Sequence, residues 1–158
     1  MRHNAVMGVL TDYFSAPSDE AAASVLDRPG GPVAGPVPLP FDAVESKGLD
    51  PHVVMGKLEE ALTGQDYWAV TTDPQYARVI LARGDGGPWV FKVSSRLQAA
   101  LAAADGITLA RAAVEWSQAE ELQINGVSPD MSGILEDLAG LARRAAAKEE
   151  HLYCWVSL

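Results

Sequence analysis

The chain has 158 residues, of which 48% are hydrophobic and 21% charged, values typical of one globular domain with its own core. Its 21 acidic and 12 basic residues give a formal net charge of −9. This acidity argues against nucleic acid or membrane lipid as the main partner, because phosphate binding needs clustered Lys and Arg. It suits a soluble surface or a basic protein partner.

The N-terminal part predicts an extension, a strand, a short helix and a long loop. Residues 1–6 show no periodicity and are expected to be a disordered extension, whereas residues 7–14 predict a strand. Ser18 precedes two acidic residues and predicts the N-cap of a short helix. Five prolines and three glycines within residues 28–40 predict a loop, but not the border of a second domain.

The middle of the chain predicts a helix that begins with a clear capping signal. Asp50 stands at the expected N-cap, Pro51 at the first helical position, and Gly64 at the expected end. The apolar residues between them recur every three or four positions. Glu59 and Glu60 fall outside this apolar stripe and are expected to face solvent.

Three strands are expected next, at residues 67–72, 77–83 and 88–93. The second and third are joined by Gly84-Asp85-Gly86-Gly87, a sequence that suits a hairpin turn with positive φ angles. Alternating apolar residues in the third strand indicate that one of its faces points into the core.

The following part predicts three helices. The first begins at Ser94 or Ser95 and runs to Ala104, and the second is capped by Thr108 and runs to about Leu122. Asn125-Gly126 predicts a turn, and residues 128–130 predict the start of a long helix that ends near Lys148.

The final stretch, residues 151–158, predicts a strand buried on both faces, because it is apolar and aromatic and contains no Gly or Pro. A chain end frays unless it is held, so this strand is expected inside a sheet, beside the strand of residues 7–14. We therefore expect one α+β domain over residues 7–158. It should have a mixed, largely antiparallel sheet of about five strands, about five helices, and the C-terminal strand at the centre of the sheet.

The sequence contains no recognisable catalytic or metal-binding motif. The Gly84–Gly87 link lacks the ending of a phosphate-binding loop, and a strand follows it. Cys154, the single cysteine, lies between two aromatic residues, which favours an inert core thiol and excludes an internal disulfide. The three histidines lack metal-ligand spacing, so neither a metal nor another cofactor is expected. No leader or membrane-spanning pattern is found, so a cytoplasmic location is expected.

One candidate binding site follows the proline-rich loop, where ionisable residues gather before a helix. Its residues are Asp42, Glu45, Lys47, Asp50 and His52. A rigid loop at the start of a helix can present such groups to a ligand. The alternative is a capped helix in which Lys47 forms an ion pair with Glu45 or Asp42.

A second candidate is the pair Trp116 and Glu120, which are expected one helical turn apart on the same face of the helix that runs to about Leu122. A carboxylate at the edge of a core aromatic residue can take part in acid–base chemistry when burial raises its pKa. The alternative is a solvated acidic helix face.

Three stretches, residues 7–14, 41–51 and 151–156, resemble a group of small actinobacterial cytosolic proteins. The resemblance extends over most of the chain from Met7 onward. No activity is established for that group, so the resemblance implies no functional residue.

Two functions from different classes are consistent with these observations. The first is a non-catalytic binding module that engages a protein partner through an acidic surface, as immunity or adaptor proteins do. The alternative is a small enzyme or small-molecule-binding protein with a polar site around Asp42–His52. A deep polar cleft would favour the alternative, and a flat acidic patch would favour the binding module.

Overall fold

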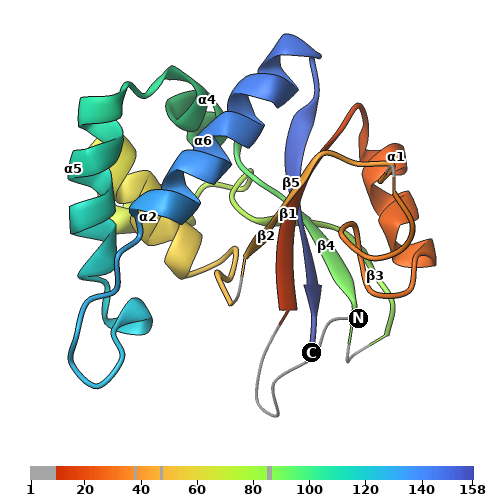
Figure 1. Ribbon diagram of the computed structural model, residues 1–158, viewed down its shortest axis with the longest axis horizontal. Coiled ribbons are helices and arrows are strands. Elements are labelled where there is room, and N and C mark those ends of the chain that lie inside the picture. The colour runs from red at the N-terminus through yellow and green to blue at the C-terminus, as the bar shows by residue number, and fades with distance from the viewer. Residues whose placement is uncertain (1–9, 38, 47, 85–86) are drawn as a thin grey trace.

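One five-stranded sheet separates two layers of the chain (Figure 1). The computed structural model describes residues 10–37, 39–46, 48–84 and 87–158. The strands are β1 Leu10–Ala16, β2 Ala43–Ser46, β3 Arg78–Ala82, β4 Trp89–Lys92 and β5 His151–Ser157. The helices are α1 Asp19–Ala23, α2 Val54–Thr63, α3 Tyr67–Thr71, α4 Ser95–Ala103, α5 Gly106–Ser117 and α6 Ser132–Ala147, with short 3₁₀ turns η1 Ser24–Asp27 and η2 Glu120–Leu122.

The strand order is β2-β1-β5-β4-β3, and every neighbouring pair is antiparallel. β5 lies at the centre, where Cys154 is opposite Tyr13 of β1 on one side and Phe91 of β4 on the other. The predicted α+β domain with a central C-terminal strand beside the first strand is therefore confirmed. The sheet is antiparallel throughout its described part.

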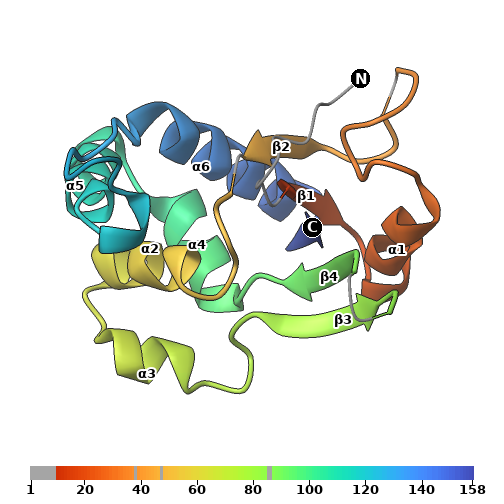
Figure 2. The same cartoon turned by 90° about the horizontal axis from the view of Figure 1, so that it is seen from below.

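Helices α2, α4 and α6 lie on one side of the sheet with α5 beyond them at the outer edge, whereas α1 lies on the other side (Figures 1 and 2). β5 contributes to both layers: Leu152, Cys154 and Val156 join the helical core, and Tyr153 and Trp155 join the opposite one. This alternation explains why residues 152–156 are all apolar or aromatic, since successive side chains of a strand point to opposite faces.

The second face is covered by α1, η1 and the loop of residues 28–40, rather than by long helices. Apart from residue 38, which is not described, this loop contains no helix or strand, as predicted. Gly31 lies against the indole ring of Trp155, and a Cβ atom at that glycine would stand 2.7 Å from the ring. The φ angle of Gly31 is +85°, a conformation that glycine adopts without strain. The loop thus covers the sheet through close backbone approach.

Two predictions about single elements are wrong. Residues 67–72 were expected to be a strand, but Tyr67–Thr71 forms helix α3. The Asp66 carboxylate caps this helix by accepting from the backbone N–H of Trp68 at 3.0 Å, which outweighs the strand preference of the aromatic and β-branched residues. β2, in turn, lies in a stretch that was expected to be a loop. It pairs with β1 as an edge strand.

Several helix starts also differ from the prediction. α2 begins at Val54, because residues 51–53 form a turn in which Asp50 accepts from the backbone N–H groups of His52 and Val53. α5 is capped by Asp105 rather than Thr108, and it ends at Ser117 instead of continuing to Leu122. α6 begins at Ser132, two residues after Asp130.

Part of the predicted N-terminal strand and hairpin lies outside the described residues. Residues 1–9 are not described, so the prediction of an extension over residues 1–6 stays a prediction. Residues 85 and 86 of the glycine-rich link are also not described. The antiparallel pairing of β3 with β4 confirms that this link joins a hairpin.

Candidate functional site

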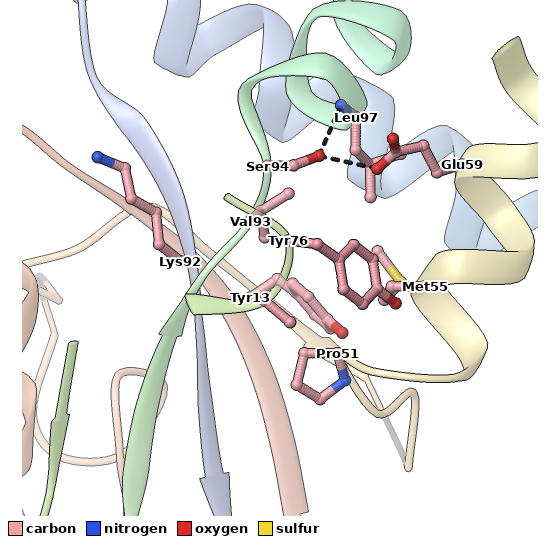
Figure 3. Close-up of a pocket in the computed structure, with 10 residues that line it drawn as sticks. Tyr13, Pro51, Met55, Glu59, Tyr76, Lys92, Val93, Ser94 and Leu97 are labelled. Carbon is pink, nitrogen blue, oxygen red and sulfur yellow. Dashed lines mark hydrogen bonds between the residues drawn. The ribbon is translucent and has the colours of Figure 1, made fainter. Parts of the chain in front are cut away.

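A small cavity lies where α2, the residues before β3 and the start of α4 meet (Figure 3). Its volume is about 10 Å³, close to the least space that one water molecule requires. Its wall is formed by Tyr13, Pro51, Met55, Glu59, Tyr76, Ala77, Lys92, Val93, Ser94 and Leu97. The cavity can therefore hold water, but it has no room for an organic substrate.

The position of Glu59 differs from the prediction. It was expected to face solvent, but it is fully buried beside this cavity. Ser94 Oγ donates to its carboxylate at 2.8 Å, and Arg96 Nε donates at 3.2 Å. A buried carboxylate requires such partners, since desolvation of an unpaired charge costs several kcal/mol, roughly. Ser94 also caps α4 by accepting from the N–H of Leu97 at 3.1 Å.

The segment that covers Glu59 is held in place by further polar contacts. Arg96 forms a short ion pair with Asp73, and the Tyr76 hydroxyl donates to the carbonyl of His52. The backbone N–H of Gln75, followed by Arg96, lowers the pKa of Asp73. These contacts fasten residues 73–76 onto α2 and α4, so this buried polar network has a structural role.

Cys154 is buried in the helical core, as expected. Burial raises the pKa of its thiol far above the usual range, so the thiolate that acts as a nucleophile is not formed near neutral pH. Tyr13 lies opposite it, and burial likewise raises the pKa of the Tyr13 phenol. The Tyr13 hydroxyl donates to the carbonyl of Leu49 at 2.5 Å. This pair therefore belongs to the packed core.

The first candidate cluster is spread over different elements. Asp42 accepts two hydrogen bonds from the guanidinium of Arg144 in α6, at 2.6 and 3.1 Å. Glu45 is exposed on the edge strand β2, and Lys47 lies outside the described residues. The predicted ion pairs of Lys47 therefore stay predictions.

The other two members of this cluster lie at the start of α2. Asp50 accepts from the N–H groups of His52 at 2.9 Å and Val53 at 2.6 Å, so it caps the turn before the helix. The His52 ring packs edge-on against Phe91 of β4, with ring centres 4.7 Å apart. Asp42 thus engages α6, whereas His52 engages β4.

Trp116 and Glu120 are not aligned as expected. Trp116 is buried, and its indole N–H donates to the carbonyl of Val54 at 2.9 Å, which ties α5 to the start of α2. Glu120 is exposed in η2. Because α5 ends at Ser117, the two residues do not follow one another on one helical face. The prediction that the Glu120 carboxylate lies on the same helical face as Trp116 is therefore wrong.

A larger acidic feature was only partly recognised from the sequence. Residues 112–142, named the acidic segment, contain no Lys, Arg or His and account for −6 of the net charge of −9. All six of its carboxylates are exposed: Glu115, Glu120, Glu121, Asp130, Glu136 and Asp137. Figure 1 shows α5 and the connection after it at the outer edge of the helical layer, away from the sheet. The absence of any basic residue between Arg111 and Arg143 is the sequence signal that identifies the acidic segment.

Two open grooves border the acidic segment. One, of about 330 Å³, lies between α2 and α5 and is lined by Lys57, Glu60, Ala61, Glu115, Gln118 and Ala119. The other, of about 390 Å³, lies between β2 and α6 and is lined by Ala43, Val44, Glu45, Glu136, Asp137, Gly140 and Arg144. Each groove therefore combines carboxylates of the acidic segment with at least one carboxylate from another element.

The described residues provide neither a metal-binding cluster nor a membrane-spanning helix. Among them, no three or more His, Cys, Asp and Glu side chains form a group that could hold a metal ion. No helix in the described ranges has both the length and the apolar character that a membrane crossing requires.

These observations define an α+β domain in which one continuous segment of the chain, residues 112–142, carries six exposed carboxylates. Comparisons with models of known protein families, with curated proteins and with solved structures return no match for this chain. The resemblance to small actinobacterial proteins therefore stays a prediction, and it assigns no role to any residue.

Proposed function

We propose that this chain is a non-catalytic binding module that engages a basic region of a partner protein through the acidic segment. The observation that carries the proposal is the run of six exposed carboxylates without an intervening cation. Charges of one sign on one surface attract an oppositely charged partner, raise the association rate and select against acidic competitors.

Most of these carboxylates are available for a partner. Glu115 forms an ion pair with Arg111 at 3.6 Å, and Asp130 accepts from the N–H of Ser132 at 3.0 Å. The other four make no side-chain hydrogen bond or ion pair with a described residue: Glu120, Glu121, Glu136 and Asp137. Among the described residues, Arg144 lies beside Glu136 and Asp137 in the groove against β2, but it hydrogen-bonds to Asp42.

The alternative, an enzyme or small-molecule binder around Asp42–His52, has less support. Asp42 and His52 engage different elements, and the cavity near Pro51 has room for about one water molecule. The open grooves beside the acidic segment suit protein side chains better than a small ligand that must be largely enclosed.

The test uses two variants of equal net charge. Glu120→Gln with Glu136→Gln changes the acidic segment, and Glu20→Gln with Glu149→Gln changes exposed acids elsewhere; each pair takes the net charge from −9 to −7. The immobilised proteins are presented with a lysine-rich peptide at low salt and at about 0.15 M salt. We expect the first pair to weaken binding several-fold more than the second. Equal effects would mean that only total charge matters, and the proposal would be wrong.

A further inference from the structure

Helix α5 exposes two large apolar side chains on one side. Ile107 is 84% exposed and Val114 is 61% exposed. They are seven residues apart, so they lie two helical turns apart on the same face. The opposite face of α5 packs into the core through Leu109, Ala113 and Trp116. The exposed pair is therefore not required to hold the helix in the fold.

A second exposed apolar pair lies in the turn that follows α5. Ile124 and Val127 are exposed, and their backbones exchange two hydrogen bonds of 3.0 Å, with Asn125 and Gly126 between them at positive φ. The side chain of Gln123 donates to the carbonyl of Gln118 just after α5, at 3.4 Å. This tight turn presents two apolar side chains beside the C-terminal end of α5.

We name these four exposed apolar residues the α5 patch: Ile107, Val114, Ile124 and Val127. The charged residues around the α5 patch are mainly acidic. Glu115 follows Val114, Glu120 and Glu121 stand between α5 and the turn, and Asp130 follows the turn. The cations near α5 are Arg111, which is paired with Glu115, Lys57 in the groove towards α2, and Arg143, which donates to the carbonyl of Ala104. An apolar centre with an acidic border is complementary to an apolar stripe with Lys and Arg beside it.

We infer that the α5 patch is where a basic amphipathic helix of the partner docks. The inference rests on the proposed function and adds the partner's class and point of contact. A helix surface offers no free backbone groups for strand addition, so its partner must pack side chain against side chain, as an amphipathic helix does. The 12 residues of α5 span about 18 Å, which matches roughly three turns of such a helix.

A second copy of this chain is a weaker occupant. Two copies that joined through the α5 patch would bring both acidic borders together, and like charges across an interface disfavour association. The same acidic border repels anionic lipid headgroups. A basic partner helix instead gains from every carboxylate of the border.

The test uses a fluorescein-labelled peptide of about 14 residues made of Leu, Ala and Lys, with leucines at helical spacing along one face. A peptide of the same composition in scrambled order serves as its control. Binding is followed by fluorescence anisotropy at about 0.15 M salt. Ile107→Ser with Val114→Ser tests the patch. Val37→Ser with Leu158→Ser is the matched control, since these side chains are 84% and 63% exposed in other parts of the chain.

We expect the patch variant to bind the amphipathic peptide at least about tenfold more weakly than the control variant, because two apolar contacts are lost. Unchanged melting temperatures verify that both variants fold.

Equal affinities of the two variants would overturn the inference. In that case the proposed function still stands if Glu120→Gln with Glu136→Gln weakens binding more than Glu20→Gln with Glu149→Gln does. If it does not, both the inference and the proposed function are wrong. A dimer in analytical ultracentrifugation that the patch variant dissolves would show a second copy as occupant and also overturn the inference.

Discussion

The two faces of the sheet are covered in different ways. On one face, α6 and its neighbouring helices interlock with the strands through large side chains such as Leu135, Leu138 and Leu141. On the other face, the short helix α1 and an irregular loop approach so closely that Gly31 touches the ring of Trp155. The first face is stabilised mainly by side-chain volume, and the second depends on the absence of a side chain at one position. Substitutions should therefore affect the two faces for different reasons.

The largest effect should come from removing the strand that belongs to both faces. Deletion of residues 153–158 takes away the buried residues Tyr153, Cys154, Trp155 and Val156. Each large apolar side chain contributes about 1.5–3 kcal/mol when buried, against a typical total stability of about 5–15 kcal/mol. We expect the truncated chain to show no cooperative thermal transition by circular dichroism. Removal of Leu158 alone, which is mostly exposed, should leave the transition in place; a cooperative transition in the longer deletion would contradict the prediction.

On the helical face, Leu138→Ala should lower the free energy of unfolding by about 2–5 kcal/mol. Leu138 in α6 is fully buried, so its truncation leaves a cavity among well-packed neighbours. Denaturant titration measures the change. Ile107→Ala, at an exposed position of α5, is the control and should change stability by less than about 0.5 kcal/mol. A similar loss in both variants would mean that the helical face does not depend on packing.

On the loop face, Gly31→Ala should lower the free energy of unfolding by about 2–4 kcal/mol. The added methyl group meets Trp155, and the positive φ angle disfavours any side chain there. Gly64→Ala separates these two causes, because Gly64 has a φ angle of +75° but nothing within 4 Å of its added Cβ. It should cost only about 1 kcal/mol. If Gly31→Ala and Gly64→Ala lower the free energy of unfolding equally in denaturant titration, the contact with Trp155 does not contribute to the loss.

The smallest effect concerns Asp19, at the start of α1 on the loop face. The Tyr153 hydroxyl donates to its carboxylate at 2.7 Å, and this hydrogen bond, with help from Lys92, lowers the pKa of Asp19. A carboxyl group whose pKa is lower in the folded state stabilises the fold above its unfolded pKa of about 3.9, and this contribution is lost as the pH falls through the folded value. The side chain is 41% exposed, so screening keeps the contribution below about 1 kcal/mol.

Melting curves of the native chain and Asp19→Asn measure this contribution. At pH 5 to 7 the native chain should melt slightly higher, and the difference should disappear as the pH is lowered below the folded pKa of Asp19. A difference that grows on acidification would have the wrong sign. Since Asp19 touches β5 through Tyr153, the result also reports how firmly α1 is held to the loop face.

The sequence predicted the elements whose signals are local. The apolar and aromatic stretch of residues 151–158 identified the central strand, and Ser18 was correctly identified as a helix cap. For α4 the prediction left Ser94 and Ser95 open, and the cap is Ser94. Helix α3 was missed because Tyr67–Thr71 is rich in strand-forming residues. The Asp66 side chain caps its first turn by accepting from the backbone N–H of Trp68, which favours the helix.

The site was less predictable because it depends on distant segments. Glu59 and Glu60 look alike in sequence, but Glu59 is buried where its carboxylate meets Ser94 and Arg96, which lie more than thirty positions further along the chain. The partner of Asp42, Arg144, lies about 100 positions away and cannot be read from local spacing. The distribution of charge was readable, however, since the acidic segment is a continuous stretch of the chain.

The position of β5 has a consequence for how the protein is made. β5 pairs with β1 across 135 positions, between Ala16 and His151, and it separates β1 from β4 in the sheet. During synthesis, β1 with β2 and β3 with β4 can form only separate antiparallel pairs, each with two unpaired strand edges, one of which β5 later covers. The two halves join when residues 151–157 emerge from the ribosome. Until then the nascent chain exposes strand edges of the kind that chaperones shield and that neighbouring chains can capture.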